Sequence, residues 1–386
     1  MRPETMQPGS PEEAAGLLAS ATAGGKTVRF RGGGTKLGWG GASDCDLAMT
    51  TAGLDRLLEH SPGDLTAVVE AGMSLQGAQE AFAEHGQMLA FDPPLGEGAA
   101  ATLGGSLATG DSGPLRHQYG SGRDLVLGVR FALANGTLAR SGGKVIKNVA
   151  GYDLAKLFSG AFGTLGLIVE VALRLHPIPR RRATVIASSE SPAALQHAAF
   201  VLAKAPLEAE SLDLYWGSRD GAVLMRFSGV DPRPRCARAA DLIADCGLRP
   251  EIVEDDSELW ERQRAAQRDA SGRGAVVRVS GLTGDLATML SAATSLSATL
   301  AARAALGIGW IRLAPGSIDD LAGSVGELRR RLAPLPCVVL DAPTGLSDRV
   351  DAFGEIGRAE MVLMRRIKAR FDPSATCNPG VFAGGI

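Results

Sequence analysis

A run of small residues between Asp92 and Gly113, DPPLGEGAAATLGGSLATGDSG, constrains this chain more than any other stretch. Two consecutive prolines stiffen its start, because each ring fixes φ and removes an N–H group. Among the glycines that follow, Gly104, Gly105, Gly110 and Gly113 are spaced among Ala, Ser and Thr. Such a backbone can press against a flat partner and offer N–H groups as donors. The alternative is a flexible surface linker.

The surroundings of this run favour the first interpretation. Predicted strands flank it on both sides, and a second glycine loop, RGGGTKLGWG, precedes it at residues 31–40. Three consecutive glycines between two strands can form a nest of N–H donors for a pyrophosphate. The loop does not follow the pattern G-x-G-x-x-G, so a Rossmann fold is not favoured. We interpret the two loops together as the cradle of a large phosphate-bearing cofactor.

Composition limits the class of protein. The 386 residues exceed one typical domain, and the hydrophobic content of 45% supports full cores. Basic and acidic residues nearly balance (40 against 42) and aromatic residues make up 5%, which disfavours a nucleic-acid-binding protein. No apolar run reaches the length of a membrane span, and the first residues carry acids and prolines instead of the apolar segment of a signal peptide. We therefore expect a cytoplasmic protein.

The cysteines and histidines predict no metal site. Five cysteines are scattered along the chain and none forms a C-x-x-C pair, so neither a zinc ribbon nor an iron–sulfur cluster is expected. The five histidines all lie at or before His197.

The hydrophobic pattern predicts short strands and helices in the first half of the chain. Strands are expected over 26–31, 46–50, 66–73, 87–91, 124–133, 137–141 and 167–175. Helices are expected after Ser10, over 54–60, after Ser74, and over 153–158. In the strand 167–175 the odd-numbered apolar residues are expected to face inward, with Glu170 and Arg174 outward.

A change of pattern at His176–Arg182, which holds two prolines and three arginines, predicts a domain boundary. Beyond it, helices are expected over 192–204, 233–246, 285–306 and, after Ser317, to residue 332. Strands are expected over 212–216, 223–227, 275–280, 309–313 and 337–340. This order predicts an antiparallel sheet backed by helices and an α+β fold class. A long helix over 348–371 then leads into DPSATCNPG at 372–380. We place the domains at 1–179, 180–341 and 342–386.

Four stretches, taken in order, resemble the FAD-binding domain of the vanillyl-alcohol oxidase / p-cresol methylhydroxylase (PCMH) family. RGGGT resembles its pyrophosphate loop, and TLGGSLATGDSGP resembles the T-x-G-G segment that lines the flavin. KNVAGYDLAKLFSGAFGTLGLI resembles its K-N-V-x-G-Y-D-L … G-T-L-G-x-I segment, and DPSATCNPG resembles the tail of D-lactate and glycolate dehydrogenases. The match covers residues 8–180 and 348–382, and the chain is particularly similar to FAD-binding subunits of glycolate oxidases.

The resemblance implies a PCMH-type FAD-binding domain of two α/β subdomains, a smaller antiparallel-sheet cap domain, and a C-terminal helix and tail that return to the FAD-binding domain. It implies contacts with the FAD diphosphate from Arg31, Gly32, Gly33, Gly34, Thr35 and Lys36. Along the ribityl chain and the ring it implies contacts from Pro93, Thr102, Gly104, Gly105, Ala108, Ser112 and Gly113. Gly166 and Ile168 would contact the adenine or the ring edge, and Asn378 would reach the flavin from the tail.

The chain departs from the family at two points. The first loop has no His or Cys, so we expect non-covalent FAD. Catalytic 2-hydroxy-acid dehydrogenases of the family carry metal-binding histidines and a glutamate in the second domain, and this chain has no His after His197. Tyr152 or Lys147 could accept the hydroxyl proton instead. The alternative for these polar residues is a salt-bridged loop.

Three functions therefore stay open. The first is the FAD-binding subunit of a glycolate dehydrogenase complex that oxidises a small 2-hydroxy acid, glycolate or D-lactate. Its partners would be a homologous catalytic FAD subunit and an iron–sulfur subunit, through which it would reach the inner face of the membrane. The second is a free-standing FAD-dependent 2-hydroxy-acid dehydrogenase. The third is a scaffold subunit that has kept the fold and lost the flavin.

Overall fold

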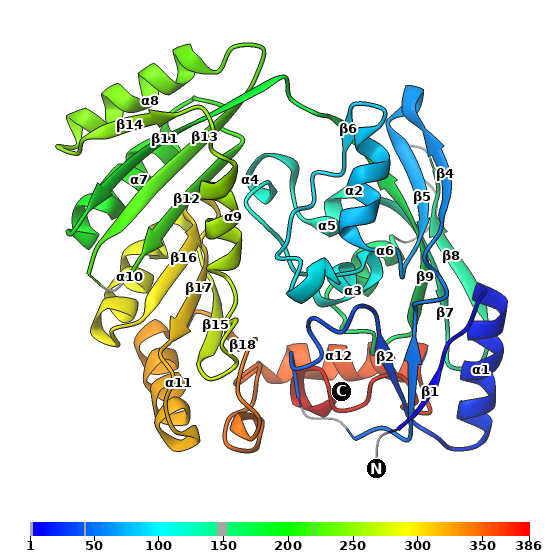
Figure 1. The fold of residues 1–386 in the computed structure, drawn as a ribbon. Helices are drawn as coiled ribbons and strands as arrows, with labels where there is room; N and C mark the ends of the chain where they lie inside the picture. Colours follow the sequence, from blue (N-terminus) through cyan, green and yellow to red (C-terminus); the bar gives the residue numbers. More distant parts are fainter. Residues whose placement is uncertain (1–2, 42–43, 145–152, 218) are drawn as a thin grey trace. The chain divides into compact units, whose positions relative to one another are not determined.

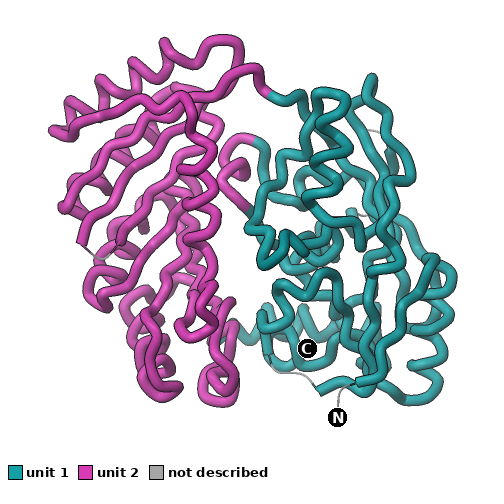
Figure 2. The backbone as a smooth tube through the Cα atoms, in the orientation of Figure 1, with its two compact units in different colours: residues 1–112, 119–178, 355–386 teal, residues 113–118, 179–354 magenta. Residues whose placement is uncertain are grey.

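The computed structural model describes residues 3–41, 44–144, 153–217 and 219–386. Lys147 and Tyr152, the two predicted proton acceptors, lie outside the described residues. The chain divides into two compact units, which Figure 2 colours separately. Unit 1 comprises residues 1–112, 119–178 and 355–386, and unit 2 comprises residues 113–118 and 179–354.

Unit 1 begins with a small parallel sheet (Figure 1). Its strands lie in the order β1 (Glu4–Met6), β3 (Leu47–Thr50), β2 (Val28–Arg31). Helix α1 (Pro11–Ala23) covers this sheet, and its buried face shares a hydrophobic cluster with β2 and β3. The hydroxyl of Ser10 accepts a hydrogen bond from the Glu13 N–H, which confirms the predicted N-cap.

The larger sheet of unit 1 is antiparallel and has the order β4–β5–β9–β7–β8. Its strands are β4 (Leu57–Ser61), β5 (Thr66–Glu70), β9 (Leu167–Arg174), β7 (Val126–Ala132) and β8 (Leu138–Gly142). Strand β9 is central, and all its residues except Arg174 are buried. The expectation that Glu170 faces outward is therefore wrong: it is 8% exposed, and Arg130 on the adjacent strand donates to it at 2.7 Å.

Helices and short segments complete unit 1. They are α2 (Leu75–Ala83), β6 (Gln87–Met88), α3 (Leu103–Thr109), α5 (Gly122–Leu125), α6 (Leu154–Phe158), β10 (His176–Pro177) and α12 (Arg358–Phe371), with α4 (Arg116–Tyr119) crossing the division between the units. Ser74 caps α2 by accepting from the Gly77 N–H at 3.0 Å, as predicted. The central glycine stretch is not a loop throughout, because residues 103–109 form helix α3.

Unit 2 is built on an eight-stranded antiparallel sheet in the order β14–β11–β13–β12–β16–β17–β15–β18. The strands are β11 (Arg181–Ser189), β12 (Ser211–Trp216), β13 (Gly221–Gly229), β14 (Pro250–Val253), β15 (Ala275–Ser280), β16 (Thr299–Arg303), β17 (Ile308–Leu313) and β18 (Cys337–Val339). Four helices pack on one face: α7 (Pro192–Lys204), α8 (Arg233–Asp245), α10 (Leu286–Ser295) and α11 (Ile318–Leu332). The predicted α+β class and the helix-backed antiparallel sheet are confirmed, as is the N-cap Ser317.

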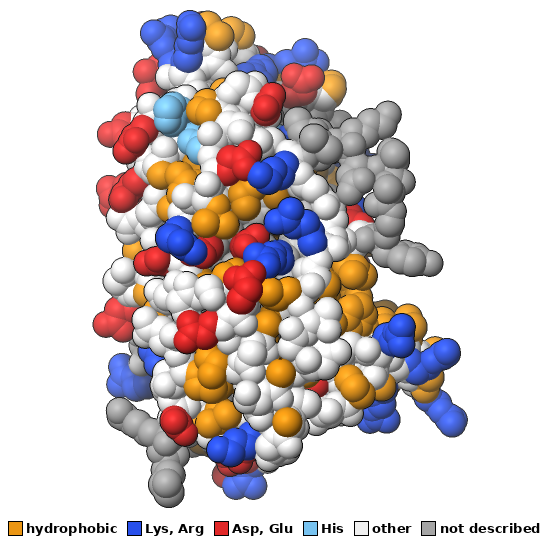
Figure 3. All heavy atoms as spheres, turned by 90° about the vertical axis from the view of Figure 1, so that its right-hand side faces the viewer, with side chains coloured by type: hydrophobic (Ala, Val, Ile, Leu, Met, Phe, Trp, Pro, Cys, Tyr) orange, Lys and Arg blue, Asp and Glu red, His pale blue; other side chains and the backbone are white. Residues whose placement is uncertain are grey.

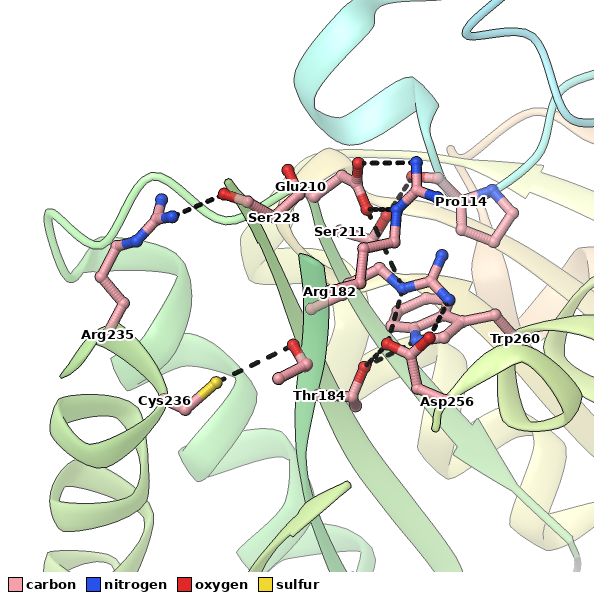
Figure 4. Close-up of polar contacts among 12 residues, drawn as sticks. Pro114, Arg182, Thr184, Glu210, Ser211, Ser228, Arg235, Cys236, Asp256 and Trp260 are labelled. Atoms are coloured by element: carbon pink, nitrogen blue, oxygen red, sulfur yellow. Dashed lines mark hydrogen bonds and ion pairs between the residues drawn. The ribbon is translucent and has the colours of Figure 1, made fainter. Parts of the chain in front are cut away.

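The other face of this sheet carries buried charges that are paired with one another (Figure 4). Arg226 donates two hydrogen bonds to Asp256, at 2.9 and 2.5 Å, and Thr184 donates to the same carboxylate at 2.7 Å. Helix α9 (Ser257–Ala265) places Trp260 against this cluster, where its indole N–H donates to Thr184. Buried charges of this kind are tolerated only when their hydrogen bonds are satisfied.

Several predicted elements are wrong. Residues 54–60 were expected to form a helix, but 57–61 form strand β4, because pairing with β5 overrides the local helical pattern. The expected helix 285–306 ends at Ser295, since Ser297 adopts φ +51° and turns the chain into strand β16. The C-terminal helix begins at Arg358 and not at 348. Strands β11 and β14 and helix α9 were not predicted.

Candidate cofactor site

A cavity of about 850 Å³, open solvent at its mouth included, lies within unit 1. Four stretches that are far apart in the sequence supply most of its wall: residues between 29 and 39, between 102 and 109, between 162 and 168, and Asn378 with Val381.

Most of the predicted cofactor-binding residues line this one cavity. They are Arg31, Gly32, Gly33, Gly34, Thr35, Lys36, Thr102, Gly104, Gly105, Ala108, Gly166, Ile168 and Asn378. Three predicted residues do not line it. Pro93 and Ser112 are buried elsewhere in unit 1, and Gly113 belongs to unit 2.

The first glycine loop presents bare backbone to the cavity. A Cβ atom at Gly33 would lie 1.5 Å from the carbonyl oxygen of Ala100, so no side chain fits there. In the part of the chain that the structure describes, the N–H groups of Gly32, Gly33 and Gly34 donate to no backbone carbonyl. Clustered free N–H groups of this kind form a nest that binds anions.

The central stretch uses its N–H groups differently from the expectation. At the start of helix α3, the Leu103 N–H donates to Met73 O at 3.0 Å and the Gly104 N–H donates to Ala71 O at 2.7 Å. The Gly105 N–H donates to the hydroxyl of Thr102. These three donors are therefore not available to a ligand. The small residues instead let α3 press onto its neighbour, since a Cβ at Gly104 would lie 2.6 Å from the Cβ of Ala71.

A buried ion pair joins the first loop to the end of the central stretch. Lys36 Nζ lies 3.3 Å from Asp111 Oδ2, and the two side chains are 6% and 2% exposed. The same ammonium lies 3.5 Å from the hydroxyl of Ser106 and 5.7 Å from the ring centroid of Trp39. The charge of Lys36 is thus neutralised by the protein, and the pair fixes the distance between two walls of the cavity.

Asn378 ties three cavity segments together. Its side-chain oxygen accepts from the Phe30 N–H at 2.7 Å, and its side-chain nitrogen donates to Phe162 O at 2.6 Å. Its own backbone N–H donates to Val28 O at 2.9 Å. Gly163 lies directly against it, since a Cβ there would come within 2.7 Å of the Asn378 side-chain nitrogen. The predicted residue is therefore in the cavity wall, where it holds strand β2, the 162–168 turn and the tail in place.

A buried lysine, which the sequence did not indicate, anchors the tail. Lys368 Nζ donates to Thr164 O at 2.7 Å, to Asp372 Oδ2 at 2.7 Å and to Cys377 O at 3.0 Å. Asp372 is 1% exposed and also accepts from two backbone N–H groups, those of residues 376 and 377. Burial raises the pKa of the Cys377 thiol well above its usual range, so this cysteine is a structural residue.

Two buried polar atoms in the cavity wall have no hydrogen-bond partner within the described residues: Arg29 Nη1 and Thr51 Oγ1. Arg29 Nη2 donates to Leu37 O at 2.9 Å, and burial lowers the pKa of the guanidinium. The sequence did not indicate either residue, because a polar residue in a strand or just after it is ordinarily solvated. Buried polar groups are nearly always paired, so this wall fits a ligand with polar and anionic groups.

The described residues show neither a metal-binding cluster nor a membrane-spanning helix. No three His, Cys, Asp or Glu side chains among them lie close enough to hold an ion together. No helix described in the structure is both long and apolar enough to cross a bilayer. On the face drawn in Figure 3, basic and acidic side chains are interspersed.

Comparison with known proteins shows what the first part of the chain is similar to. Residues 4–142 match a family described as an FAD binding domain. Over 124 residues the chain is 41% identical to the glycolate oxidase subunit GlcE of Escherichia coli, which is 32% of this chain and 35% of that protein. Over 162 residues it is 35% identical to the glycolate oxidase subunit GlcD of Bacillus subtilis, covering 42% of this chain and 34% of that protein.

Further similarities agree with this result. A D-lactate dehydrogenase of Archaeoglobus fulgidus is 35% identical over 183 residues, covering 47% of this chain and 40% of that protein. A solved structure of alkyldihydroxyacetonephosphate synthase has a TM-score of 0.73 and 16% identity, covering 97% of this chain and 75% of that chain, which shows a shared fold. Residues 4–142 are thus similar to an FAD binding domain. The matches of the chain span only about a third of the length of the GlcE and GlcD relatives.

Proposed function

We propose that the cavity of unit 1 binds FAD non-covalently and that the chain serves in the oxidation of a small 2-hydroxy acid. The observation that carries the proposal is the first glycine loop, whose residues 32–34 line the cavity and have N–H groups that donate to no backbone carbonyl in the described chain. The match of residues 4–142 to an FAD binding domain supports the same ligand.

The residues of the cavity divide into two roles in this proposal. The N–H groups of residues 32–34 would hold the diphosphate, and the backbone around Gly166 and Ile168 would hold one end of the molecule. Lys36, Asn378 and Lys368 would keep the walls at the required separation through their contacts with other segments. Bound flavin would supply a two-electron acceptor for the hydroxyl-bearing carbon of the substrate. Lys147 and Tyr152 remain candidates for accepting the hydroxyl proton.

We further propose that the chain acts as the FAD-binding subunit of a glycolate dehydrogenase-like complex. The identities with GlcE and GlcD support this role. Its partners would be a homologous catalytic FAD subunit and an iron–sulfur subunit, with glycolate or D-lactate as the substrate. A free-standing FAD-dependent dehydrogenase is the second candidate. It is supported by the similarity to the D-lactate dehydrogenase of Archaeoglobus fulgidus, whose name does not describe it as a subunit.

The test begins with the purified chain and FAD. We expect a yellow protein whose flavin is released by acid precipitation, because the first loop contains no His or Cys for a covalent link. Anaerobic glycolate or D-lactate is then added, first to the chain alone and then to the chain co-expressed with candidate partner subunits. Bleaching only with the partners supports the subunit role, and bleaching of the chain alone supports the free-standing enzyme. A chain that takes up no FAD contradicts the proposal and supports a scaffold.

A further inference from the structure

Besides the backbone N–H groups of residues 32–34, the cavity wall contains two polar side chains, each with a buried atom that has no hydrogen-bond partner among the described residues. Arg29 lies on strand β2, where one of its terminal nitrogens, Nη2, donates to the carbonyl of Leu37. The other, Nη1, is buried and has no partner among the described residues. A buried guanidinium nitrogen without an acceptor costs free energy, so a position in a cavity wall indicates a ligand that supplies the acceptor.

Thr51 is the second of these side chains. It is 5% exposed, and its hydroxyl has no partner in the described chain although its backbone is fully engaged. Its N–H donates to Arg31 O at 2.9 Å, and its carbonyl accepts from the Leu54 N–H at 2.9 Å. Thr51 lines the cavity, so a ligand in the cavity can supply the missing partner.

The two residues lie on neighbouring segments of the small parallel sheet and line the same cavity. Arg29 pairs with Ala48 in the β2–β3 register, and Thr51 is three residues farther along the β3 segment. At about 3.3 Å per residue, their backbones are about 10 Å apart. An extended molecule with a charged and a polar section can contact both side chains across this spacing.

We infer that Arg29 and Thr51 are side-chain ligands of the bound dinucleotide, with Arg29 donating to a phosphate oxygen and Thr51 hydrogen-bonding to the polar chain of the same molecule. This inference rests on the proposed FAD binding. Arg29 would add a full positive charge to the backbone nest, whereas the charge of Lys36 is neutralised by Asp111. Charge-assisted hydrogen bonds are the stronger kind.

The experiment measures binding of three probes to the ligand-free full chain by calorimetry: FAD, ADP and riboflavin. Arg29→Met is expected to weaken FAD and ADP by a similar factor, roughly 10- to 150-fold, and to leave riboflavin unchanged because it has no phosphate. Thr51→Val keeps the shape of the side chain and is expected to weaken FAD by roughly 2- to 13-fold. Arg140→Met removes an arginine that is 59% exposed and outside this cavity, and is expected to change nothing.

Each outcome separates the inference from the proposed function. If wild type binds FAD and Arg29→Met binds it equally well, the inference is overturned and the proposed function stands. If Arg29→Met weakens riboflavin as much as FAD, Arg29 only shapes the loop through Leu37, and the inference is again overturned. If wild type binds ADP in an Arg29-dependent way but binds no FAD, the phosphate contact stands and the proposed function fails. Binding of none of the probes to wild type overturns both.

Discussion

Replacing Lys368 by methionine tests the packing that holds the cavity together. The substitution keeps the length of the side chain but removes its positive charge. Asp372 would then keep its negative charge while it is 1% exposed, and the carbonyls of Thr164 and Cys377 would lose a donor. Leaving one partner of a buried ion pair alone costs about 3–5 kcal/mol.

The structure favours the lower end of that range. Two backbone N–H groups still donate to Asp372 after the substitution, at 3.1 and 2.7 Å, so its charge keeps part of its compensation. We therefore expect a loss of about 3 kcal/mol. For a folding unit of this size, each kcal/mol lowers the melting temperature by about 2–4 °C, which predicts a decrease of about 6–12 °C.

The assay is thermal unfolding of the ligand-free chain followed by circular dichroism, with Lys156→Met as the matched control. Lys156 pairs with Asp153 at 3.2 Å, but the side chains are 48% and 54% exposed. Such a pair contributes at most about 1 kcal/mol, so its loss is expected to lower the melting temperature by at most about 4 °C. If the two variants melt at the same temperature, the reasoning about the buried ammonium is refuted.

Three further predictions concern the cavity and unit 2. Gly33→Ala is expected to abolish measurable FAD binding because its Cβ would overlap the Ala100 carbonyl, whereas Gly38→Ala in the same loop meets nothing within 4 Å and is expected to bind normally. Asn378→Ala removes the hydrogen bonds of its side chain to the Phe30 N–H and the Phe162 carbonyl and is expected to lower the melting temperature, at about 0.5–1.5 kcal/mol for each hydrogen bond. Burial raises the pKa of Asp213 to about 6, outweighing the nearby Arg303. Because the unfolded chain ionises first, the stability of wild type relative to Asp213→Asn is expected to fall as pH rises from about 4 to 6 and to stay level above.

The sequence could predict that the glycine-rich segments meet, because each of them contains glycines, and backbone without side chains can approach a shared ligand closely. Three helix starts could also be predicted, because a Ser before an apolar run can cap a helix with its own hydroxyl. Ser10, Ser74 and Ser317 all cap helices in this way. Strand β4 could not be predicted, because its conformation depends on pairing with strand β5, which the local residue pattern does not reveal.

The side chains that hold the cavity could not be predicted from the sequence. Lys368 contacts a carbonyl 204 residues away, and Asn378 bridges groups 348 and 216 residues away. One sequence gives no information on such pairings. The role of Arg29 is even more difficult to predict, because arginine in a short strand is ordinarily exposed. Its unpaired nitrogen can be recognised only in the folded structure of the cavity.

The contacts of the cavity residues distinguish two causes of weaker FAD binding, destabilisation of unit 1 and loss of a direct contact with the ligand, which a binding assay alone does not distinguish. Lys36, Lys368 and Asn378 act on the walls through contacts with other protein groups, so their loss weakens FAD binding only by destabilising unit 1. Arg29 and Thr51 each have an atom that the described protein leaves unpaired, and Arg29 also makes one hydrogen bond to Leu37 O. Their loss should therefore weaken binding and change the melting temperature of the ligand-free chain only slightly. Removing an unsatisfied buried group can even stabilise the empty protein. A variant of Arg29 that melts higher without FAD and binds FAD more weakly would therefore identify a residue retained for its ligand and not for the fold.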